Sequence, residues 1–198
     1  MVRQNHKYMK LIDSLAALGI ERRHATACNR YVDLMHQWNQ RINLSAAKTR
    51  DDLVGHVVDS LHVVPHLAFA STVLDVGAGG GLPGVLVAIC LPDARVVSLE
   101  PVNKKVAFLR TAARELGLAN YEPRAERLED YVGDGFDAAV SRATWDLATW
   151  LTTGAARVRA GGKVVGMEAV DQVQLGPTDV RHSYQHLDRT RAVVVRTV

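Results

Sequence analysis

The spacing of apolar residues changes character near residue 71 of the 198-residue chain. Before this point, apolar side chains recur at three- and four-residue steps, which is the period of an amphipathic helix. After it, short apolar runs typical of buried strands alternate with further helical segments. The first part predicts three helices, over Tyr8–Leu18, from about Glu21 to Trp38, and over about Asp51–Leu67. The second part predicts strands over Thr72–Val76, Ala94–Leu99, Tyr121–Arg124, Phe136–Ser141, Gly162–Met167 and Arg191–Val198, separated by helices over Pro83–Leu91, Asn103–Leu116 and Leu147–Arg157.

Alternation of strands and helices predicts an α/β fold with a mostly parallel, twisted sheet that is covered by helices on both faces. We therefore divide the chain into an N-terminal helical cap, residues 1–68, and a compact α/β core, residues 69–198. Gly176-Pro177 predicts a loop before the last strand. Right-handed crossovers place all strand-to-helix loops at one edge of such a sheet, and ligands bind at that edge. Residues in these loops are therefore the first candidates for a functional site.

Composition narrows the class of protein without choosing a function. Hydrophobic residues make up 47% of the chain, which is enough for one sizeable core. The longest apolar run, Val85–Leu91, is far too short to cross a bilayer, and the first residues lack the apolar core of a secretory signal. We therefore expect a cytoplasmic protein without a membrane span. Because no apolar patch of the kind that joins subunits is visible, we also expect a monomer.

The cysteines, histidines and charges exclude some chemistry and leave other chemistry open. Cys28 and Cys90 each lie among apolar residues, so they predict reduced core thiols rather than a disulfide or a zinc site. The eight histidines show no metal-ligand spacing, and we expect no metal. A net charge of +3 is compatible with a nucleic-acid partner but does not indicate one.

The clearest candidate site is the glycine-rich segment that follows the first predicted strand, Asp75-Val76-Gly77-Ala78-Gly79-Gly80-Gly81. Glycines suit a loop that turns sharply over a ligand, and such a loop directs backbone N–H groups toward a negative group. That group is pyrophosphate in a dinucleotide and the methionine carboxylate in S-adenosylmethionine. The glycines alone do not separate these cofactors, because Gly79, Gly81 and Gly84 also satisfy the dinucleotide spacing.

Two residues near these glycines favour S-adenosylmethionine. Asp75 precedes the glycines, where its carboxylate can meet the ammonium of the cofactor directly or through water. Pro83 removes one N–H from the start of the helix, which would weaken a pyrophosphate cradle. Glu100 ends the second predicted strand, where a carboxylate can accept hydrogen bonds from the ribose hydroxyls of either cofactor. Its alternative is a surface ion pair with Lys104 or Lys105.

Six motifs from about Tyr31 to Gly166 give the chain a more specific resemblance. They are Trp38-Asn39-Gln40-Arg41-Ile42-Asn43-Leu44-Ser45, His56-Val57-Val58-Asp59-Ser60-Leu61, the segment from Asp75 to Gly84, Lys104-Lys105-Val106-Ala107-Phe108-Leu109-Arg110, Arg124-Ala125-Glu126 and Ser141-Arg142-Ala143. In this order and spacing the chain resembles the 16S ribosomal RNA guanine-N7 methyltransferases, also called the glucose-inhibited division protein B family. The resemblance implies a Rossmann-like class I methyltransferase fold with an N-terminal helical cap. It also implies S-adenosylmethionine as cofactor and 16S ribosomal RNA or the small ribosomal subunit as partner.

The resemblance further implies roles for single residues. Gly77 and Leu82 would line the cofactor, while Ala125 and Glu126 would approach its adenine. Arg142 would stand at the edge of the active site after the fourth strand, and it is the candidate catalytic residue. Its guanidinium could hold an RNA phosphate, bond guanine O6, contact the cofactor, or form an internal salt bridge. With the glycine loop included, the candidate cofactor-binding residues are Asp75, Gly77, Gly79, Gly81, Leu82, Glu100, Ala125, Glu126 and Arg142.

The chemistry implied by the resemblance needs few catalytic groups. Guanine N7 has a free lone pair, so no base has to remove a proton, and alignment with exclusion of water suffices. The sequence lacks the Asn-Pro-Pro-aromatic motif of amino-directed methyltransferases after the fourth strand. His56 and Asp59 lie about one turn apart on the third predicted helix, where they either shape the floor of the site or pair locally. Positive residues that could follow an RNA backbone, or form ordinary ion pairs, are Arg41, Lys48, Arg50, Lys104, Lys105, Arg110, Arg114, Arg124 and Arg127.

Two departures from the family pattern keep other functions open. Where the family carries a lysine and a glycine after the fifth strand, this chain has Met167-Glu168-Ala169, and the region that follows is short. The first alternative is a diverged relative that methylates a small molecule. The second is a non-catalytic module that binds a cofactor or RNA.

Overall fold

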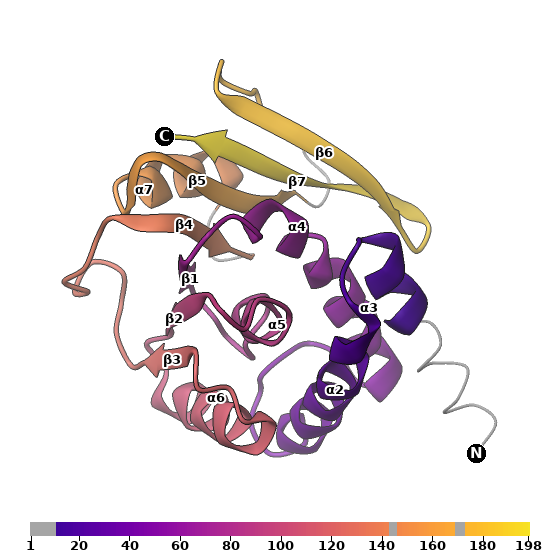
Figure 1. Ribbon diagram of the computed structural model, residues 1–198. Coiled ribbons are helices and arrows are strands. Elements are labelled where there is room, and N and C mark those ends of the chain that lie inside the picture. Colours follow the sequence, from indigo (N-terminus) through magenta and orange to yellow (C-terminus); the bar gives the residue numbers. More distant parts are fainter. Residues whose placement is uncertain (1–10, 143–145, 169–172) are drawn as a thin grey trace.

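A seven-stranded sheet with strand order β3-β2-β1-β4-β5-β7-β6 forms the centre of the protein (Figure 1). The computed structural model describes residues 11–142, 146–168 and 173–198. The strands are β1 (Thr72–Val76), β2 (Arg95–Leu99), β3 (Tyr121–Arg124), β4 (Phe136–Ser141), β5 (Val158–Glu168), β6 (Asp179–His186) and β7 (Arg189–Thr197). Strands β1 to β5 pair in parallel, and β7 lies antiparallel between β5 and β6. The predicted mostly parallel α/β sheet is therefore confirmed, and its strand order reverses between β1 and β4.

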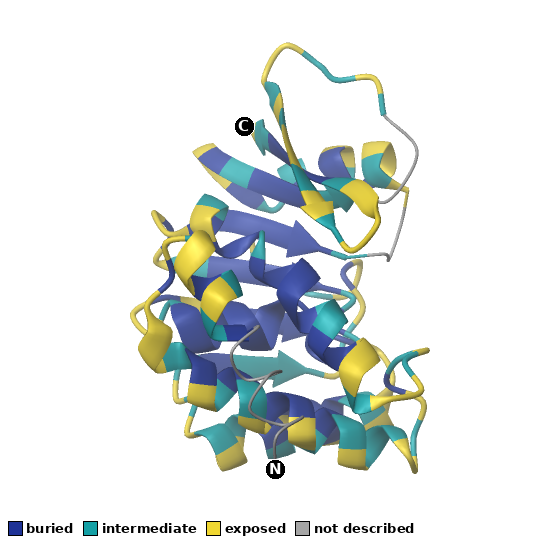
Figure 2. Cartoon of the chain, turned by 90° about the vertical axis from the view of Figure 1, so that its right-hand side faces the viewer, coloured by how far each residue is buried: buried dark blue, intermediate teal, exposed yellow. Residues whose placement is uncertain are grey.

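Helices cover both faces of this sheet, as predicted. They are η1 (Arg22–His24), α2 (Ala25–Asn39), α3 (Arg50–Leu61), α4 (Val64–Leu67), α5 (Gly84–Cys90), α6 (Asn103–Leu116) and α7 (Leu147–Ala155), and residues 11–17 are also helical. Helices α5 and α6 pack on one face, with α2, α3 and α4 against them, and α7 packs on the other. Successive residues of β1 point to opposite faces of the sheet. Val73 belongs to the hydrophobic cluster that includes α5 and α6, and Leu74 belongs to the cluster that includes α7. Buried residues accordingly gather on the strands and the inner helix faces (Figure 2).

The helical cap is fastened to the α/β core by aromatic and aliphatic side chains of α2. Tyr31 and Met35 are buried, and the half-buried ring of Trp38 lies 5.6 Å from that of Phe108 on α6. Trp38 therefore packs inside the protein. Because side chains of the cap share one hydrophobic cluster with β1, α5 and α6, the division at residue 68 stays a prediction.

The prediction of one continuous helix over Asp51–Leu67 is wrong. Helix α3 ends at Leu61, and α4 begins at Val64 with Pro65 in its first turn. A proline is tolerated in a first turn because its missing N–H has no partner there, whereas inside a longer helix it breaks a hydrogen bond. Helix α3 begins at a capping box, in which Thr49 accepts from the Asp52 N–H and Asp52 accepts from the Thr49 N–H.

The region after β5 is a two-stranded hairpin, and its first strand was not predicted. Strand β6 carries polar residues at nearly every position, with exposed and half-buried side chains along its length. It lies at the edge of the sheet and pairs only with β7 over Asp179–His186. The expected loop therefore extends only to Thr178, and the segment beyond it adds an antiparallel edge to the sheet.

Glu168, at the end of β5, is neutralised by this hairpin. Its carboxylate accepts from Arg181 Nε at 2.7 Å and Arg181 Nη2 at 3.0 Å, and from the Val173 N–H at 2.7 Å. The side chain is buried, so it presents no negative charge to a ligand. The departure from the family pattern at Glu168 is explained by its partner Arg181 on β6. Ala169 and Ala143, which belong to the sequence motifs, lie outside the described residues.

Candidate functional site

The glycine-rich loop connects β1 to α5 at the carboxyl edge of the sheet. Gly77, Gly79 and Gly81 have φ angles of 73°, 56° and 92°, in the left-handed region that glycine enters without strain. The loop is anchored to the next strand, because the N–H groups of Gly77 and Ala78 both donate to the carbonyl of Leu99. A shaped backbone cradle therefore forms where the strand order reverses, as the sequence predicted for this segment.

The cap holds the loop from the other side. Tyr31 on α2 donates its hydroxyl hydrogen bond to the carbonyl of Gly80. Burial raises the pKa of the Tyr31 hydroxyl, so it stays protonated and remains a donor. A Cβ on Gly80 would lie 2.6 Å from Met35 Cε, which shows how closely α2 covers the loop.

Asp75, on β1, lies beneath the loop with its carboxylate against the start of α5. Its Oδ2 accepts from the Ser98 hydroxyl at 2.8 Å, its carboxylate also accepts from the Gly84 N–H, and Oδ1 has no partner among the described residues. Burial raises the pKa of the Asp75 carboxyl to about 7. Asp75 lines neither of the cavities that flank the loop, so its contact with a cofactor stays a prediction.

Glu100 is the second buried carboxylate under the loop. It accepts from the Gly79 N–H and from the Val102 N–H, each at 2.9 Å, and Lys105 Nζ lies 4.0 Å away. Glu100 is only 4% exposed, so its main contacts are these buried hydrogen bonds rather than the surface ion pair considered from sequence. Glu100 therefore ties the loop after β1 to the end of β2.

Two cavities open on opposite sides of Gly77. The core-side cavity, of about 220 Å³, is lined by Val76, Gly77, Leu99, Pro101 and the segment Glu126–Glu129. The cap-side cavity, of about 180 Å³, is lined by Met35, Leu44, Ser45, His56, Gly77, Ala78, Gly79, Gly80, Leu82 and Arg142. Gly77, Gly79, Leu82, Glu126 and Arg142 are thus brought together around the loop. Four predicted residues line neither cavity: Asp75 and Glu100 are buried beneath the loop, Gly81 is buried against Val85, and Ala125 is exposed beside Glu126.

Arg142 is held by two residues of α3. Its Nη1 donates to the Ser60 hydroxyl at 3.0 Å, and its Nη2 lies 3.7 Å from Asp59 Oδ2. Burial lowers the pKa of the Arg142 guanidinium, while the adjacent Asp59 raises it. The internal salt bridge considered from sequence is therefore present, and the same side chain also lines the cap-side cavity.

Asp59 connects Arg142 to the hairpin that sequence reasoning missed. Its Oδ2 accepts from Arg191 Nη1 at 3.0 Å, and its Oδ1 accepts from the Tyr184 hydroxyl at 2.9 Å. The ring of Tyr184 stacks on His62 with centroids 3.6 Å apart. Because Asp59 is 1% exposed, one buried carboxylate serves two guanidiniums, and the group carries one net positive charge. No signal in the polar sequence of β6 pointed to Tyr184.

His56 completes the wall between Arg142 and the surface. Its Nδ1 lies 3.2 Å from the Ser45 hydroxyl, and burial followed by the charge of Arg142 lowers the pKa of its imidazole. A neutral imidazole therefore faces the cap-side cavity at neutral pH. His56 lines the cap-side cavity, whereas Asp59 lies outside it and pairs with Arg142 and Arg191, so a role of the two residues in the floor of the site stays a prediction.

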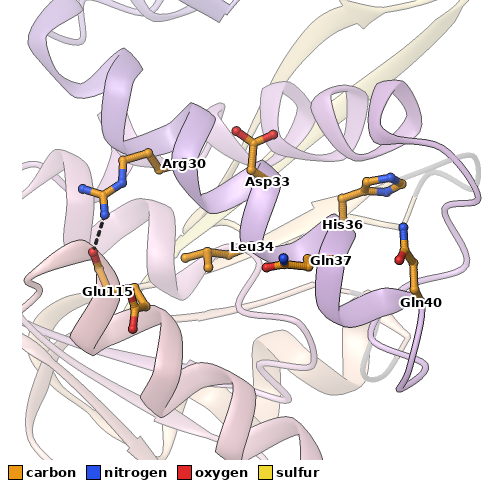
Figure 3. A pocket seen from close by; sticks show the side chains of 7 residues that line it. All are labelled: Arg30, Asp33, Leu34, His36, Gln37, Gln40 and Glu115. Carbon is orange, nitrogen blue, oxygen red and sulfur yellow. Dashed lines mark hydrogen bonds between the residues drawn. The ribbon is translucent and has the colours of Figure 1, made fainter.

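Several arginines proposed for RNA binding are engaged within the protein. Arg50 donates to Asp33 and Asn29, Arg124 pairs with Glu122, and Arg114 pairs with Glu115. A separate surface hollow lies on the outer side of α2, with residues Arg30, Asp33, Leu34, His36, Gln37, Gln40 and Glu115 around it (Figure 3). That hollow contains none of the predicted site residues. Within the described ranges there is no helix long and apolar enough to cross a membrane, and no three His, Cys, Asp or Glu side chains are grouped as metal ligands.

The fold and the loop define the chain as having a class I methyltransferase architecture. An O-methyltransferase from Bacillus cereus in complex with SAH superposes with a TM-score of 0.62 at 16% identity, over 85% of this chain and 91% of that chain. Sequence comparison is more specific, because the model of the rRNA small subunit methyltransferase G family matches residues 24–191. The ribosomal RNA small subunit methyltransferase G of Neisseria gonorrhoeae is 38% identical over 83% of this chain and 84% of its own length. That of Neisseria meningitidis is 36% identical over 94% and 96%. The chain belongs to the rRNA small subunit methyltransferase G family.

Proposed function

We propose that the protein transfers the methyl group of S-adenosylmethionine to N7 of a guanine in 16S ribosomal RNA. The observation that carries this proposal is the position of the glycine loop between two cavities, with Arg142 on the wall of the cap-side cavity. The family membership supports ribosomal RNA as the acceptor, and it agrees with the cytoplasmic location expected from sequence. One cavity then serves the cofactor and the other receives the base.

The acceptor groups around the loop fit S-adenosylmethionine. The core-side cavity has apolar walls from Val76 and Leu99, and the Glu126 carboxylate can accept from the amino group of an adenine. Glu100 can accept from ribose hydroxyls with its remaining lone pairs. The unpartnered Oδ1 of Asp75 supports the expected contact with the ammonium, directly or through water. The cofactor supplies an electrophilic methyl group on a positively charged sulfur.

The cap-side cavity suits an acceptor that needs no deprotonation. Its described lining residues include no carboxylate, and His56 is the one imidazole among them. Guanine N7 supplies its own electron pair to the methyl carbon, and the carbon–sulfur bond breaks with its electron pair kept by sulfur. Arg142 can donate to guanine O6 and so orient the base with N7 toward the loop. The loop and cap exclude water from this point.

The acceptor is tested by supplying labelled S-adenosylmethionine with 30S subunits, naked 16S RNA or a small-molecule extract. We expect label in RNA and none in the extract, whereas label confined to small molecules would refute the proposal. Gly79→Asp is the matched binding variant, because it adds a side chain and a negative charge at a left-handed position of the loop. Affinity for S-adenosylmethionine should fall strongly in this variant, and an unchanged affinity would show that the cofactor binds elsewhere.

A further inference from the structure

The β6–β7 turn carries a large apolar side chain in an exposed position. Leu187 and Asp188 form this two-residue turn, since the last paired residues of the hairpin are His186 and Arg189. Leu187 has a φ of 53° and is 70% exposed. Two-residue turns with positive φ at the first position favour glycine, which has no Cβ to clash with the backbone. A leucine here is strained without being buried in the fold, so its side chain is available to a ligand.

The turn also forms one wall of a larger cavity beside the cap-side cavity. This cavity, of about 770 Å³, lies between the turn and the opposite wall of residues 46–48 and the first half of α3. His56 lines both cavities, so the larger one adjoins the position of Arg142. Its volume is within the range of ligand sites and exceeds what a single base needs. The turn and α3 lie together at the right of Figure 1, and Figure 2 views the molecule from that side.

Cations and carboxylates both line this cavity. Lys48 and Arg189 are exposed on opposite walls. The Asp52 carboxylate is occupied by the backbone N–H groups at the start of α3, and Asp59 is occupied by two arginines and a tyrosine. Asp51 and Asp188 are further exposed carboxylates of this lining, and Lys48 and Arg189 are the cations through which it can contact the phosphodiester backbone of RNA. The exposed carboxylate of Asp188 suits N–H groups on the edge of a base.

We propose that the β6–β7 turn binds RNA next to the guanine that is methylated. Leu187 packs against the neighbouring base and fills the stacking position that the target guanine leaves, while Lys48 and Arg189 contact phosphates on either side. This inference rests on the proposed function. The major groove of an RNA helix is too deep and narrow for side chains, so N7 is reached in an unstacked guanine. An apolar side chain that replaces the base in the stack favours that unstacked state.

The kinetic test compares Leu187→Gly with Leu187→Met. Glycine relieves the strained φ, so Leu187→Gly should fold at least as well as the wild type while its contact with RNA is lost. Loss of one stacking contact should raise KM for 16S RNA about tenfold, whereas Leu187→Met should stay near the wild type. The Kd for S-adenosylmethionine should not change in either variant. A KM for RNA in Leu187→Gly equal to that of the wild type would refute the stacking role.

The phosphate contacts are tested by the salt dependence of RNA binding. Arg189→Gln should reduce the slope of log Kd against log salt by about one, because one counterion fewer is released. Arg110→Gln, on the exposed side of α6, tests the RNA path that the sequence left open there, and it should leave the slope unchanged. If Arg110→Gln changes the slope and Arg189→Gln does not, RNA lies over α6 and the inference is wrong.

A crosslinking test detects the contact between the β6–β7 turn and RNA without depending on methyl transfer. Both native cysteines are buried, so a thiol-directed photocrosslinker on Leu187→Cys labels the turn selectively. We expect crosslinks to 16S RNA close to the methylated nucleotide. Val132→Cys is the control, since Val132 is 98% exposed in the β3–β4 connection, on the opposite side of Figure 1. If guanine N7 is methylated normally but both sites crosslink equally, the inference is wrong and the proposed function stands. If the wild type does not methylate N7, the proposed function is wrong.

Discussion

Replacing Asp59 by asparagine tests how the cap and the hairpin hold Arg142. The Asp59 carboxylate is 1% exposed and balances the guanidiniums of Arg142 and Arg191, whose side chains are 19% and 26% exposed. Removing one partner of a fully buried ion pair costs about 3–5 kcal/mol, and the partial exposure of both arginines screens the charge that is left. We therefore expect Asp59→Asn to lower the free energy of unfolding by about 3 kcal/mol, at the lower end of this range.

Urea denaturation measures this loss against a matched surface control. Glu21→Gln removes a carboxylate whose pair with Arg23 has side chains 64% and 66% exposed, so it should cost less than about 1 kcal/mol. Adding Arg191→Gln to Asp59→Asn should recover part of the loss, because one of the two uncompensated guanidiniums is then removed. Equal losses in Asp59→Asn and Glu21→Gln would refute the reasoning, as would a double variant less stable than Asp59→Asn alone.

Three further substitutions test the loop and its carboxylates. Gly84→Ala places a Cβ 2.2 Å from Asp75 Oδ2, so the thermal midpoint and the affinity for S-adenosylmethionine should both fall; an unchanged midpoint in a thermal melt would contradict this contact. Burial raises the pKa of Asp75 to about 7, above its value in the unfolded chain, so the folded state binds this proton more tightly. The stabilisation is full below about pH 4 and is lost as the pH rises toward about 7. In urea unfolding, the free energy of unfolding of Asp75→Asn should therefore lack this decrease with pH. A pH dependence equal to that of the wild type would refute the role of Asp75. Glu126→Gln should weaken binding of S-adenosylmethionine on the order of fivefold by calorimetry, because a neutral amide oxygen replaces the charged acceptor for the adenine amino group. Wild-type affinity would remove Glu126 from the cofactor site.

The parts of the fold that sequence predicted best are those whose apolar spacing records burial. The bounds of β1, α6 and β4 agree with the prediction, because their apolar runs or helical spacing reflect burial directly. The bounds of β3 also agree, although it is an edge strand with mostly half-buried side chains. Strand β6 was missed for the opposite reason. It is an edge strand whose side chains are half-buried or exposed, and it is held by pairing with β7 and by contacts such as Tyr184 on His62. Periodicity does not record contacts of this kind.

The candidate site was predictable where local backbone chemistry determines it. Positive φ in this loop follows from the glycine pattern, as Gly77 and Gly79 show. The position of Glu126 beside the loop was implied by the resemblance to the family rather than by local backbone chemistry. The environment of Arg142 was not predictable, since Asp59 and Tyr184 are 83 and 42 residues away from it in the chain. The charge that Glu168 presents also depends on a distant partner, because Arg181 on the unpredicted strand β6 neutralises its carboxylate.

The position of the methyl group on 16S RNA tests the central claim most directly. RNA treated with the protein and S-adenosylmethionine can be digested to nucleosides for mass spectrometry, and a second sample can be reduced and cleaved at N7-methylated guanosines. We predict 7-methylguanosine as the product, cleavage at a single nucleotide, and loss of both signals in Gly79→Asp. Methylation at another atom or another base, or no methylation of RNA by the wild type, would contradict the account.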